Sequence, residues 1–355
     1  MTPYVPAADP PERIRAATAF AHEVLPEVSR TFAISIRFLP GTLGLAVNAA
    51  YLLCRIADTI EDDNSTPPAR RAELLEQFLR TLDDRDAADA FPSVAAGLQG
   101  DPAHLRLVQH TDLVLVLFRT LPPRTRERVA HWVREMGVGM AKFVRTYPSG
   151  IRIQTLAEYK EYCYYVAGTV GYMLTELWHE HAGAIGKREY DRLLVKCQAF
   201  GEALQTVNIL KDIAWDAEHE NSIYIPADDL QAQGSGHETL LSPAHLEHNH
   251  KAVVHFIELA RHDLDDALEY TLMIPRRAFR IRAFCVLPLL FAYATLRDLS
   301  GSRAMLQVGG QVKISRREVK ALMIAGVLSL GSNAALRWLV KRVKTRPFTL
   351  APVAG

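Results

Sequence analysis

The sequence predicts an all-α protein folded as a single domain over residues 1–355. Apolar residues recur with helical rather than alternating spacing over most segments of the chain. Helix starts are marked repeatedly, for example by the capping-box spacing of Thr155 with Glu158 and of Ser315 with Glu318. The stretches between apolar segments are too short to be domain linkers, and no internal repeat is evident. One helical domain is therefore the simplest architecture.

The individual helices follow from their start and stop signals in chain order. A proline-rich N-terminus precedes the first helix. Thr66 precedes two prolines at one helix start, and Ser242 followed by Pro243 marks another. Polar breaks rich in Gly and Pro fall near 100–102, 147–150, 226–242 and 299–311. We expect helices at 11–25, 40–63, 67–83, 103–120, 124–146, 155–181, 187–218, 243–272, 276–299 and 315–343, with flexible ends at 1–11 and 344–355.

The composition limits the class of protein. Hydrophobic residues make up 49% of the chain and charged residues 23%, which is enough for a large core. The formal net charge of +1 gives no electrostatic case for nucleic acid as a partner. No CxxC pair occurs, so the cysteines indicate buried thiols in a reducing compartment. They are Cys54, Cys163, Cys197 and Cys285. With no secretory signal in Met1–Arg13, we expect a cytoplasmic, monomeric protein.

The C-terminal region raises the question of membrane contact. The uncharged run Ala321–Leu336 is about 16 residues long, whereas a membrane span needs about 20. A cluster of basic residues follows it, formed by Arg337, Lys341, Arg342, Lys344 and Arg346. These residues would suit peripheral contact with an anionic membrane. A plain basic helix end explains them more simply.

One acidic cluster lies at the end of an apolar helix. Asp58, Glu61 and Asp62 have the spacing i, i+3, i+4, which sets three carboxylates on one helix face. The preceding run, Ala46–Cys54, is almost wholly apolar and suits a core helix. Taken alone, the carboxylates could simply be the solvated end of that helix, because unpaired carboxylates are costly to bury.

A second cluster changes this interpretation. Asn208, Asp212 and Asp216 recur every four residues, about 6 Å per step along one stripe. A solvated face, with Lys211 as an ion-pair partner, would explain this stripe by itself. Two acidic stripes that emerge from core helices are instead what a metal–diphosphate clamp needs. Carboxylates without a Cys/His cluster favour Mg²⁺ over zinc, and Mg²⁺ bound in this way usually also holds substrate phosphates.

The clusters predict a metal-dependent enzyme that handles a diphosphate. The metal would neutralise charge on the leaving diphosphate as a carbon–oxygen bond breaks. Chain-elongating prenyl synthases usually carry Asp-Asp-x-x-Asp motifs, which this chain lacks. Class I terpene cyclases use a spacing similar to that of Asn208, Asp212 and Asp216, so they stay open at this point.

Several motifs, in order, resemble the squalene/phytoene synthase family over roughly Val28 to Val319. Their details are most similar to the squalene synthases within that family. The matching segments are 29–32 (SRTF), 51–62 (YLLCRIADTIED), 136–141 (MGVGMA), 162–171 (YCYYVAGTVG), 205–216 (QTVNILKDIAWD) and 312–317 (VKISRR).

The resemblance implies a helix bundle around a central apolar cavity, with isoprenoid diphosphates as substrates. Two farnesyl diphosphates would condense head to head through presqualene diphosphate, and NADPH would reduce the product to squalene. A dry cavity would protect the cationic intermediates from water. The implied Mg²⁺ ligands are Asp58, Glu61, Asp62, Asp212 and Asp216.

The resemblance also implies roles for single residues. Arg30 and Arg55 would hold phosphate oxygens, which suits guanidinium geometry. Tyr165 is our candidate for the proton removal that closes the cyclopropane ring, although a tyrosine in such a helix is more often a packing residue. Further substrate-binding residues would be Phe32, Tyr51, Gln205, Asn208, Ala167, Gly168 and Phe284. The implied NADPH-binding residues are Lys313, Ser315 and Arg317, together with Asn208, although a basic capped helix start explains the first three equally well.

The chain departs from the family pattern at the second cluster. Trp215 stands where the family usually has Glu, and Glu220 and Ser222 stand where it commonly has Arg. These changes leave the acceptor and the second half-reaction open. The alternatives are a phytoene- or dehydrosqualene-type synthase without reduction, a terpene cyclase, a prenyl transfer to another acceptor, and a non-catalytic relative.

Overall fold

The computed structural model describes residues 9–349, except for the side chain of Arg30, and the all-α prediction is confirmed there. The helices are α1 (Pro11–Val28), α2 (Arg30–Ile36), α3 (Gly41–Asp62), α4 (Pro68–Arg80), α5 (Arg85–Val94), α6 (Pro102–Gln109), α7 (Thr111–Arg119), α8 (Pro123–Thr146), α9 (Leu156–Cys163), α10 (Thr169–His181), α11 (Lys187–Leu194), α12 (Cys197–His219), α13 (Ala227–Ala232), α14 (Leu246–Met273), α15 (Phe279–Ser300), α16 (Arg316–Ser329) and α17 (Asn333–Thr345). Shorter turns are the π-helix η1 (Tyr164–Gly168) and the 3₁₀ turns η2 (His237–Thr239), η3 (Pro243–His245) and η4 (Ala304–Leu306). An isolated bridge between Arg152 and Ile223 is the only extended pairing among the described residues.

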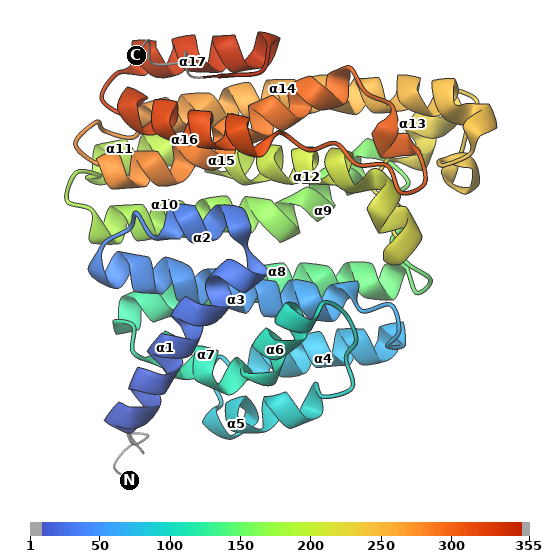
Figure 1. The fold of residues 1–355 in the computed structure, drawn as a ribbon. Coiled ribbons are helices and arrows are strands. Elements are labelled where there is room, and N and C mark those ends of the chain that lie inside the picture. The colour runs from blue at the N-terminus through green and yellow to red at the C-terminus, as the bar shows by residue number, and fades with distance from the viewer. Residues whose placement is uncertain (1–8, 350–355) are drawn as a thin grey trace.

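The long helices are stacked in layers, with the site between two of them. In Figure 1, α3 and α8 lie in the middle of the molecule, α4 to α7 lie below them, and α10 and α12 lie above. The helices α14 to α17 close the top. The helix α12 packs against α10 and α14, and α8 packs against α3 and α4. The two helices that carry the acidic clusters, α3 and α12, therefore belong to neighbouring layers.

Three of the expected helices are each broken in two. The segment 103–120 divides into α6 and α7 at His110, whose φ of −121° and ψ of 29° leave the helical region. The segment 187–218 divides into α11 and α12 around Lys196. The segment 315–343 divides into α16 and α17, because the Ser332 side chain caps a new helix by accepting a hydrogen bond from Ala335 N. The short helices α2, α5 and α13 were not predicted.

Both ends of the described chain contact the rest of the protein. Asp9 forms ion pairs with Arg85 and Arg119, at 3.1 Å in both cases. At the other end, α17 continues to Thr345, and Phe348 N donates a 2.7 Å hydrogen bond to Glu318 Oε1. The flexibility expected at 1–11 and 344–355 stays a prediction, and residues 1–8 and 350–355 lie outside the described residues.

Two helices are long and apolar enough to cross a membrane by length and composition. They are α3 and α15, and 72% and 83% of their most apolar windows are buried inside the protein. Core helices pass the same test, so this is weak support for a span. The run Ala321–Leu336 is not a continuous helix, because α16 ends at Ser329 and α17 begins at Asn333.

Candidate active site

Two adjoining cavities lie between the α3 and α12 layers. We call the first the apolar chamber; its volume is about 160 Å³ and its walls come from α2, α3, α8, α10, η1, α12 and α15. We call the second the acid cavity; its volume is about 320 Å³. Both are lined by the same five residues, so they are continuous at that point. These shared residues are Arg55, Asp58, Val166, Gln205 and Asn208.

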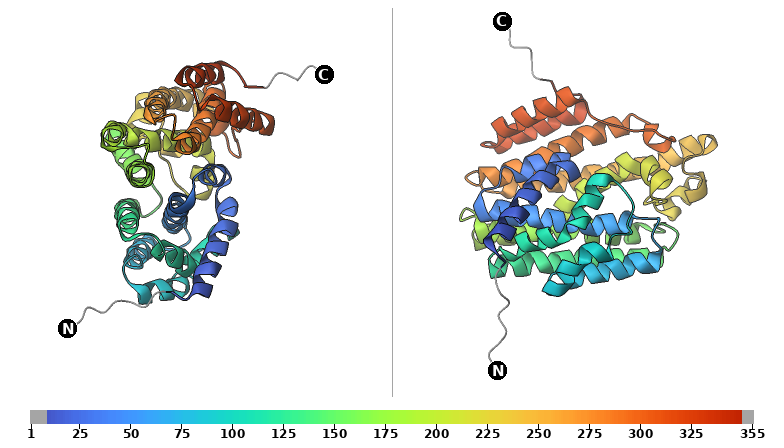
Figure 2. Two further views of the ribbon diagram at one scale, coloured as in Figure 1. Left: turned by 90° about the vertical axis from the view of Figure 1, so that its left-hand side faces the viewer. Right: turned by 60° about the horizontal axis from the view of Figure 1, so that its bottom comes forward.

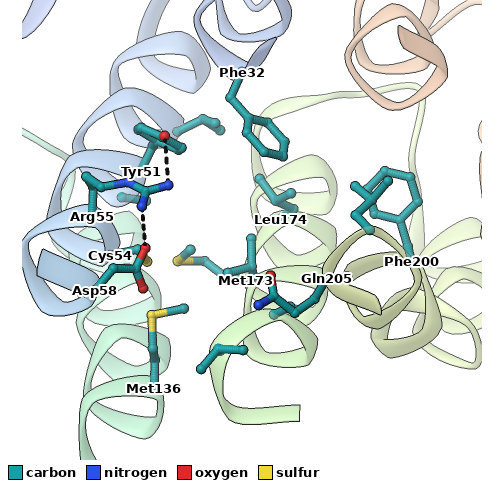
Figure 3. Close-up of a pocket in the computed structure, with 18 of the residues that line it drawn as sticks. Phe32, Tyr51, Cys54, Arg55, Asp58, Met136, Met173, Leu174, Phe200 and Gln205 are labelled. Atoms are coloured by element: carbon teal, nitrogen blue, oxygen red, sulfur yellow. Dashed lines mark hydrogen bonds and ion pairs between the residues drawn. The ribbon is translucent and has the colours of Figure 1, made fainter. Parts of the chain in front are cut away.

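The first acidic cluster extends along α3 into the acid cavity. Asp58 forms a 3.3 Å ion pair with Arg55, which Figure 3 shows on one wall, opposite Gln205. Glu61 is only 5% exposed, and its Oε1 has no hydrogen-bond partner among the described residues. Asp62 is exposed and lines the same cavity. A buried carboxylate oxygen without a partner is costly, which indicates a ligand that supplies positive charge.

The second acidic cluster extends along α12 and faces the same cavity. Asp216 is 9% exposed, whereas the Asp212 side chain is 41% exposed and forms a 3.0 Å ion pair with Lys211. The prediction that the two stripes meet is thus borne out by their shared cavity. Six acidic and two basic side chains line it. The acids are Asp58, Glu61, Asp62, Asp212, Asp216 and Glu220, and the bases are Arg55 and Lys211.

This excess of negative charge perturbs the carboxylates. Burial, with repulsion from Asp58 and Glu220, raises the pKa of Glu61 to about 8. Burial, with repulsion from Glu220 and Asp212, raises the pKa of Asp216 to about 9. Burial also raises the pKa of Asp58, while Arg55 opposes that shift. Such shifts mark a site that favours cations.

The carboxylates surround the cavity rather than converge on one point. Among residues 9–349, no three His, Cys, Asp or Glu side chains are already close enough to hold an ion by themselves. Mg²⁺ is usually bound by one or two carboxylates, with waters and substrate phosphates completing its shell. The donor set and the unpartnered Glu61 Oε1 therefore fit magnesium held together with a phosphate-bearing substrate.

Glu220 is a site residue that the sequence analysis noted only as a departure. It lies at the end of α12 and lines the acid cavity. Its backbone oxygen accepts hydrogen bonds from the Asn64 side chain and from Ser222 Oγ, which fixes the turn after α12. Burial, with repulsion from Asp212 and Asp58, raises the pKa of Glu220 to about 7. The signal was present, because Glu220 continues the four-residue spacing of the second cluster by one step.

The proton-transfer candidate Tyr165 lines neither of the two cavities, and its assignment stays a prediction. Its ring packs on α8, so closely that a Cβ added to Gly139 would lie 2.0 Å from Tyr165 Cγ. Tyr165 belongs to the π-helix η1, in which Thr169 N donates to Tyr164 O. Tyr162, three residues earlier, lines the acid cavity, and its hydroxyl donates a 3.3 Å hydrogen bond to Tyr224.

The apolar chamber is made by close helix packing and aromatic side chains. Gly171 and Gly201 let η1, α10 and α12 approach closely, since an added Cβ would lie 1.9 Å from Cys197 O and 2.0 Å from Ala167 O respectively. Phe284 of α15 closes the chamber, and its ring lies 6.4 Å from that of Phe32. Of the residues predicted to bind substrate, Phe32, Tyr51, Ala167 and Phe284 line the chamber, whereas Gly168 does not.

The residues expected to bind NADPH are spread over two of the cavities described. Lys313 lines an open groove beside Arg346, whereas Asn208 lies between the chamber and the acid cavity. The Ser315 hydroxyl caps α16 by accepting from Glu318 N. Arg317 is exposed on the first turn of α16. The NADPH assignment of these residues stays a prediction. The predicted phosphate ligand Arg30 has its side chain outside the described part of the chain.

Comparison with known proteins gives a consistent result. The family model described as squalene/phytoene synthase matches residues 25–318. Squalene synthase 1 of Arabidopsis thaliana is 28% identical over 302 residues, which are 84% of this chain and 68% of that protein. Squalene synthase BSS of Botryococcus braunii is 35% identical over 193 residues, which are 54% of this chain and 39% of that protein. The matched parts thus span 39% to 68% of these curated relatives.

Solved structures share the fold at lower sequence identity. The complex of TcSQS with the ligand BPH1237 superposes with a TM-score of 0.81 at 23% identity, over 94% of this chain and 90% of that one. A dehydrosqualene synthase in complex with a ligand gives a TM-score of 0.57 at 20% identity, over 95% of this chain and 98% of that one. At these identities, the likeness supports the fold alone.

Proposed function

Since the chain belongs to the squalene/phytoene synthase family, we propose that it condenses two farnesyl diphosphates head to head, through presqualene diphosphate, to a linear triterpene hydrocarbon. The observation that carries the proposal is the junction of an acid cavity with an apolar chamber at Arg55 and Asp58. A prenyl diphosphate has the same division into a polyanionic head and an apolar tail.

The acid cavity is proposed to bind the diphosphate heads. Asp58, Glu61, Asp62, Asp212 and Asp216 would hold magnesium, with Glu220 as a sixth carboxylate. Magnesium, when bound there, would neutralise the charge on the leaving diphosphate. Arg55 Nε has no hydrogen-bond partner among the described residues, so it is available to a phosphate oxygen at the junction.

The remaining steps depend on the chamber and on Tyr162. When the donor C–O bond breaks, the diphosphate leaves with the electron pair, and the acceptor double bond attacks the allylic cation. A carbon-bound proton then leaves as the cyclopropane closes, and we assign Tyr162 to orient its transfer to the departed diphosphate. Burial raises the pKa of Tyr162, so its hydroxyl stays protonated, and it would donate to that anion by turning away from Tyr224. The apolar walls exclude the water that would capture the cation.

Reduction of the product to squalene would need NADPH, and two of the residues expected to bind it, Lys313 and Asn208, line different cavities. This separation favours, as the second candidate function, a dehydrosqualene-type product that forms when the final cation loses a proton instead of gaining a hydride.

A product assay tests the proposal. Purified protein is incubated with farnesyl or geranylgeranyl diphosphate and Mg²⁺, with and without NADPH, and the hydrocarbons are identified by mass spectrometry. We expect a product from farnesyl diphosphate that disappears with EDTA and falls at least about a hundredfold in Asp58→Asn and Asp212→Asn. Asp83→Asn, at an exposed carboxylate outside both cavities, is the matched control. Full activity in both site variants would refute the assignment.

A further inference from the structure

A buried arginine lies behind the first acidic cluster. Arg71 of α4 is 5% exposed and forms no ion pair with any residue that the structure describes. It lines a small cavity of about 10 Å³ together with Glu61 and Asp62, which line the acid cavity as well. Arg71 does not line the acid cavity, so it approaches the cluster from the opposite side. Burying an unpaired cation is costly, so its hydrogen bonds must account for its position.

The hydrogen bonds of Arg71 cap the end of α3. Its Nη1 donates to Glu61 O at 2.6 Å and to Asn64 Oδ1 at 3.1 Å. The last four carbonyl groups of a helix have no partner within it, and this end of the helix carries partial negative charge. The carboxylates of Asp58 and Asp62 add to that charge. Arg71 therefore stabilises a helix end that the acidic side chains would otherwise destabilise.

Asn64 extends this contact to the other acidic cluster. Its Nδ2 donates a hydrogen bond to Glu220 O, at the end of α12. Glu220 N in turn donates to Asp216 O at 3.0 Å, so the bonded turn is continuous with the second cluster. Arg71 and Asn64 thus connect α4, the end of α3 and the end of α12. We call this pair of side chains the helix tie.

The helix tie crosses a gap that helix packing does not close. The helix α3 packs on α4, α7 and α8 but has few close contacts with α12. Figures 1 and 2 show α3 between α4 and α12, and the two cavities lie between α3 and α12. Direct packing of α3 on α12 therefore does not set the separation of the two acidic clusters, whereas the helix tie bonds one helix end to the other.

We propose that Arg71 is a positioning residue for the magnesium ligands, because the helix tie fixes the separation of the two acidic clusters. The inference rests on the proposed function, in which carboxylates from both helices hold magnesium on one diphosphate. Mg²⁺ demands oxygen ligands at about 2.0–2.1 Å in near-octahedral geometry, so a shift of about 1 Å at one helix end would misplace them. Arg71 acts without touching the substrate, since it lies outside the acid cavity and the apolar chamber.

Calorimetry with Mg²⁺ and inorganic pyrophosphate tests the proposal on the full chain, without turnover. Arg71→Met should weaken Mg²⁺ binding at least about tenfold, as loss of a side chain that orients ligands commonly does. Removal of a cation would by charge alone strengthen Mg²⁺ binding, so the sign of the change separates positioning from electrostatics. Arg71→Lys keeps a donor for Glu61 O and should recover part of the loss. Unchanged or tighter binding in Arg71→Met would overturn the proposal.

Arg282 provides the matched control for a loss of stability. It is fully buried, it donates to Ile274 O at 2.6 Å and to Asn333 Oδ1 at 2.8 Å, and it lines neither the acid cavity nor the chamber. Its contacts are therefore of the same two kinds, a carbonyl at the end of a helix and an asparagine side chain. Arg282→Met should lower the melting temperature at least as far as Arg71→Met but leave Mg²⁺ binding unchanged. An equal loss of binding in both variants would contradict a positioning role.

A double variant tests whether Arg71 and Asn64 act as one unit. Asn64→Ala should also weaken Mg²⁺ binding, and its combination with Arg71→Met should lose little more than the larger single change, because both interrupt the same connection. Losses that add fully would contradict the helix tie. A parent protein that binds no Mg²⁺ with pyrophosphate would refute the acid cavity and the proposed function with it. A parent that binds, with variants that bind equally well, would refute this inference alone.

Discussion

The acid cavity and the apolar chamber share the helices α3 and α12 but contribute to the fold in opposite ways. Along α3, chamber residues such as Cys54 give way to Glu61, and along α12, Phe200 gives way to Asp216. Burial of apolar surface around the chamber stabilises the protein. The cavity gathers six acids against two bases, which costs stability until cations bind. The apolar chamber therefore stabilises the fold, whereas the acid cavity binds cations at a cost in stability.

The largest expected effect is a loss of stability on substitution of a chamber residue. Phe284→Ala removes a ring that is 2% exposed and lies 5.3 Å from the ring of Trp178, and should lower the free energy of unfolding by about 3–5 kcal/mol. Phe279→Ala on the same helix is the matched control, because Phe279 is 55% exposed and should change stability by less than about 0.5 kcal/mol. Urea unfolding measures both, and similar losses in the two variants would mean that Phe284 is not a core residue.

The next effect has the opposite sign for stability. Asp216→Asn replaces a carboxyl that burial, with repulsion from Glu220 and Asp212, keeps protonated in the folded state although it ionises in the unfolded state, so the metal-free variant should melt at a higher temperature than the parent. The same change should lower turnover by about two orders of magnitude, because a cation ligand is lost. Thermal melting with EDTA and the product assay give the two readouts. A variant that is both less stable and inactive would instead mark Asp216 as a structural residue.

The pH dependence of stability tests the cost of the acid cavity. The folded pKa values of Glu61 and Asp216, about 8 and about 9, lie above the unfolded values near 4, so the folded state binds more protons in between. Stability of the metal-free protein should therefore be highest at low pH within this window and fall as pH rises from about 4 to about 9. Mg²⁺ with inorganic pyrophosphate should restore stability at the upper end. Melting temperatures across pH, with and without these ligands, test this, and a flat profile would contradict it.

The sequence was sufficient for features set by local spacing. The helical period and the caps predicted the all-α fold, and steps of three and four residues placed Asp58, Glu61, Asp62, Asp212 and Asp216 on helix faces. That the two stripes face one cavity depends on tertiary packing, which the spacing and the family resemblance indicated but only the structure shows. Glu220 continues the same four-residue spacing, but it lies just beyond the helix end at His219 and was not included in the second cluster.

Features that depend on packing were missed. A π-helical turn has no clear sequence signal, so the packing of Tyr165 against Gly139 could not be predicted. The broken helices at His110 and Lys196 carry apolar patterns that continue across the break, because both halves pack on the same core. The chamber walls depend on the close approach of η1, α10 and α12 at Gly171 and Gly201, which the spacing of apolar residues does not predict.

The smallest expected effect is on Mg²⁺ binding, and it distinguishes Glu220 from Trp215 at the end of α12. Trp215 stands where the family usually has an acid, but it is 47% exposed, stacks on His219 at 3.7 Å, and lines neither cavity. Glu220 faces the cavity instead. Glu220→Gln should weaken Mg²⁺ binding in the presence of inorganic pyrophosphate about tenfold by calorimetry, whereas Trp215→Ala should leave it unchanged. The reverse ranking would mean that the outer face of α12, rather than the cavity, controls binding. An equal loss in both variants would point to disorder of the helix end. The structure argues against such disorder, because the Glu220 backbone oxygen accepts hydrogen bonds from Asn64 and Ser222. These bonds hold the turn in place without the side chain of Glu220 or Trp215.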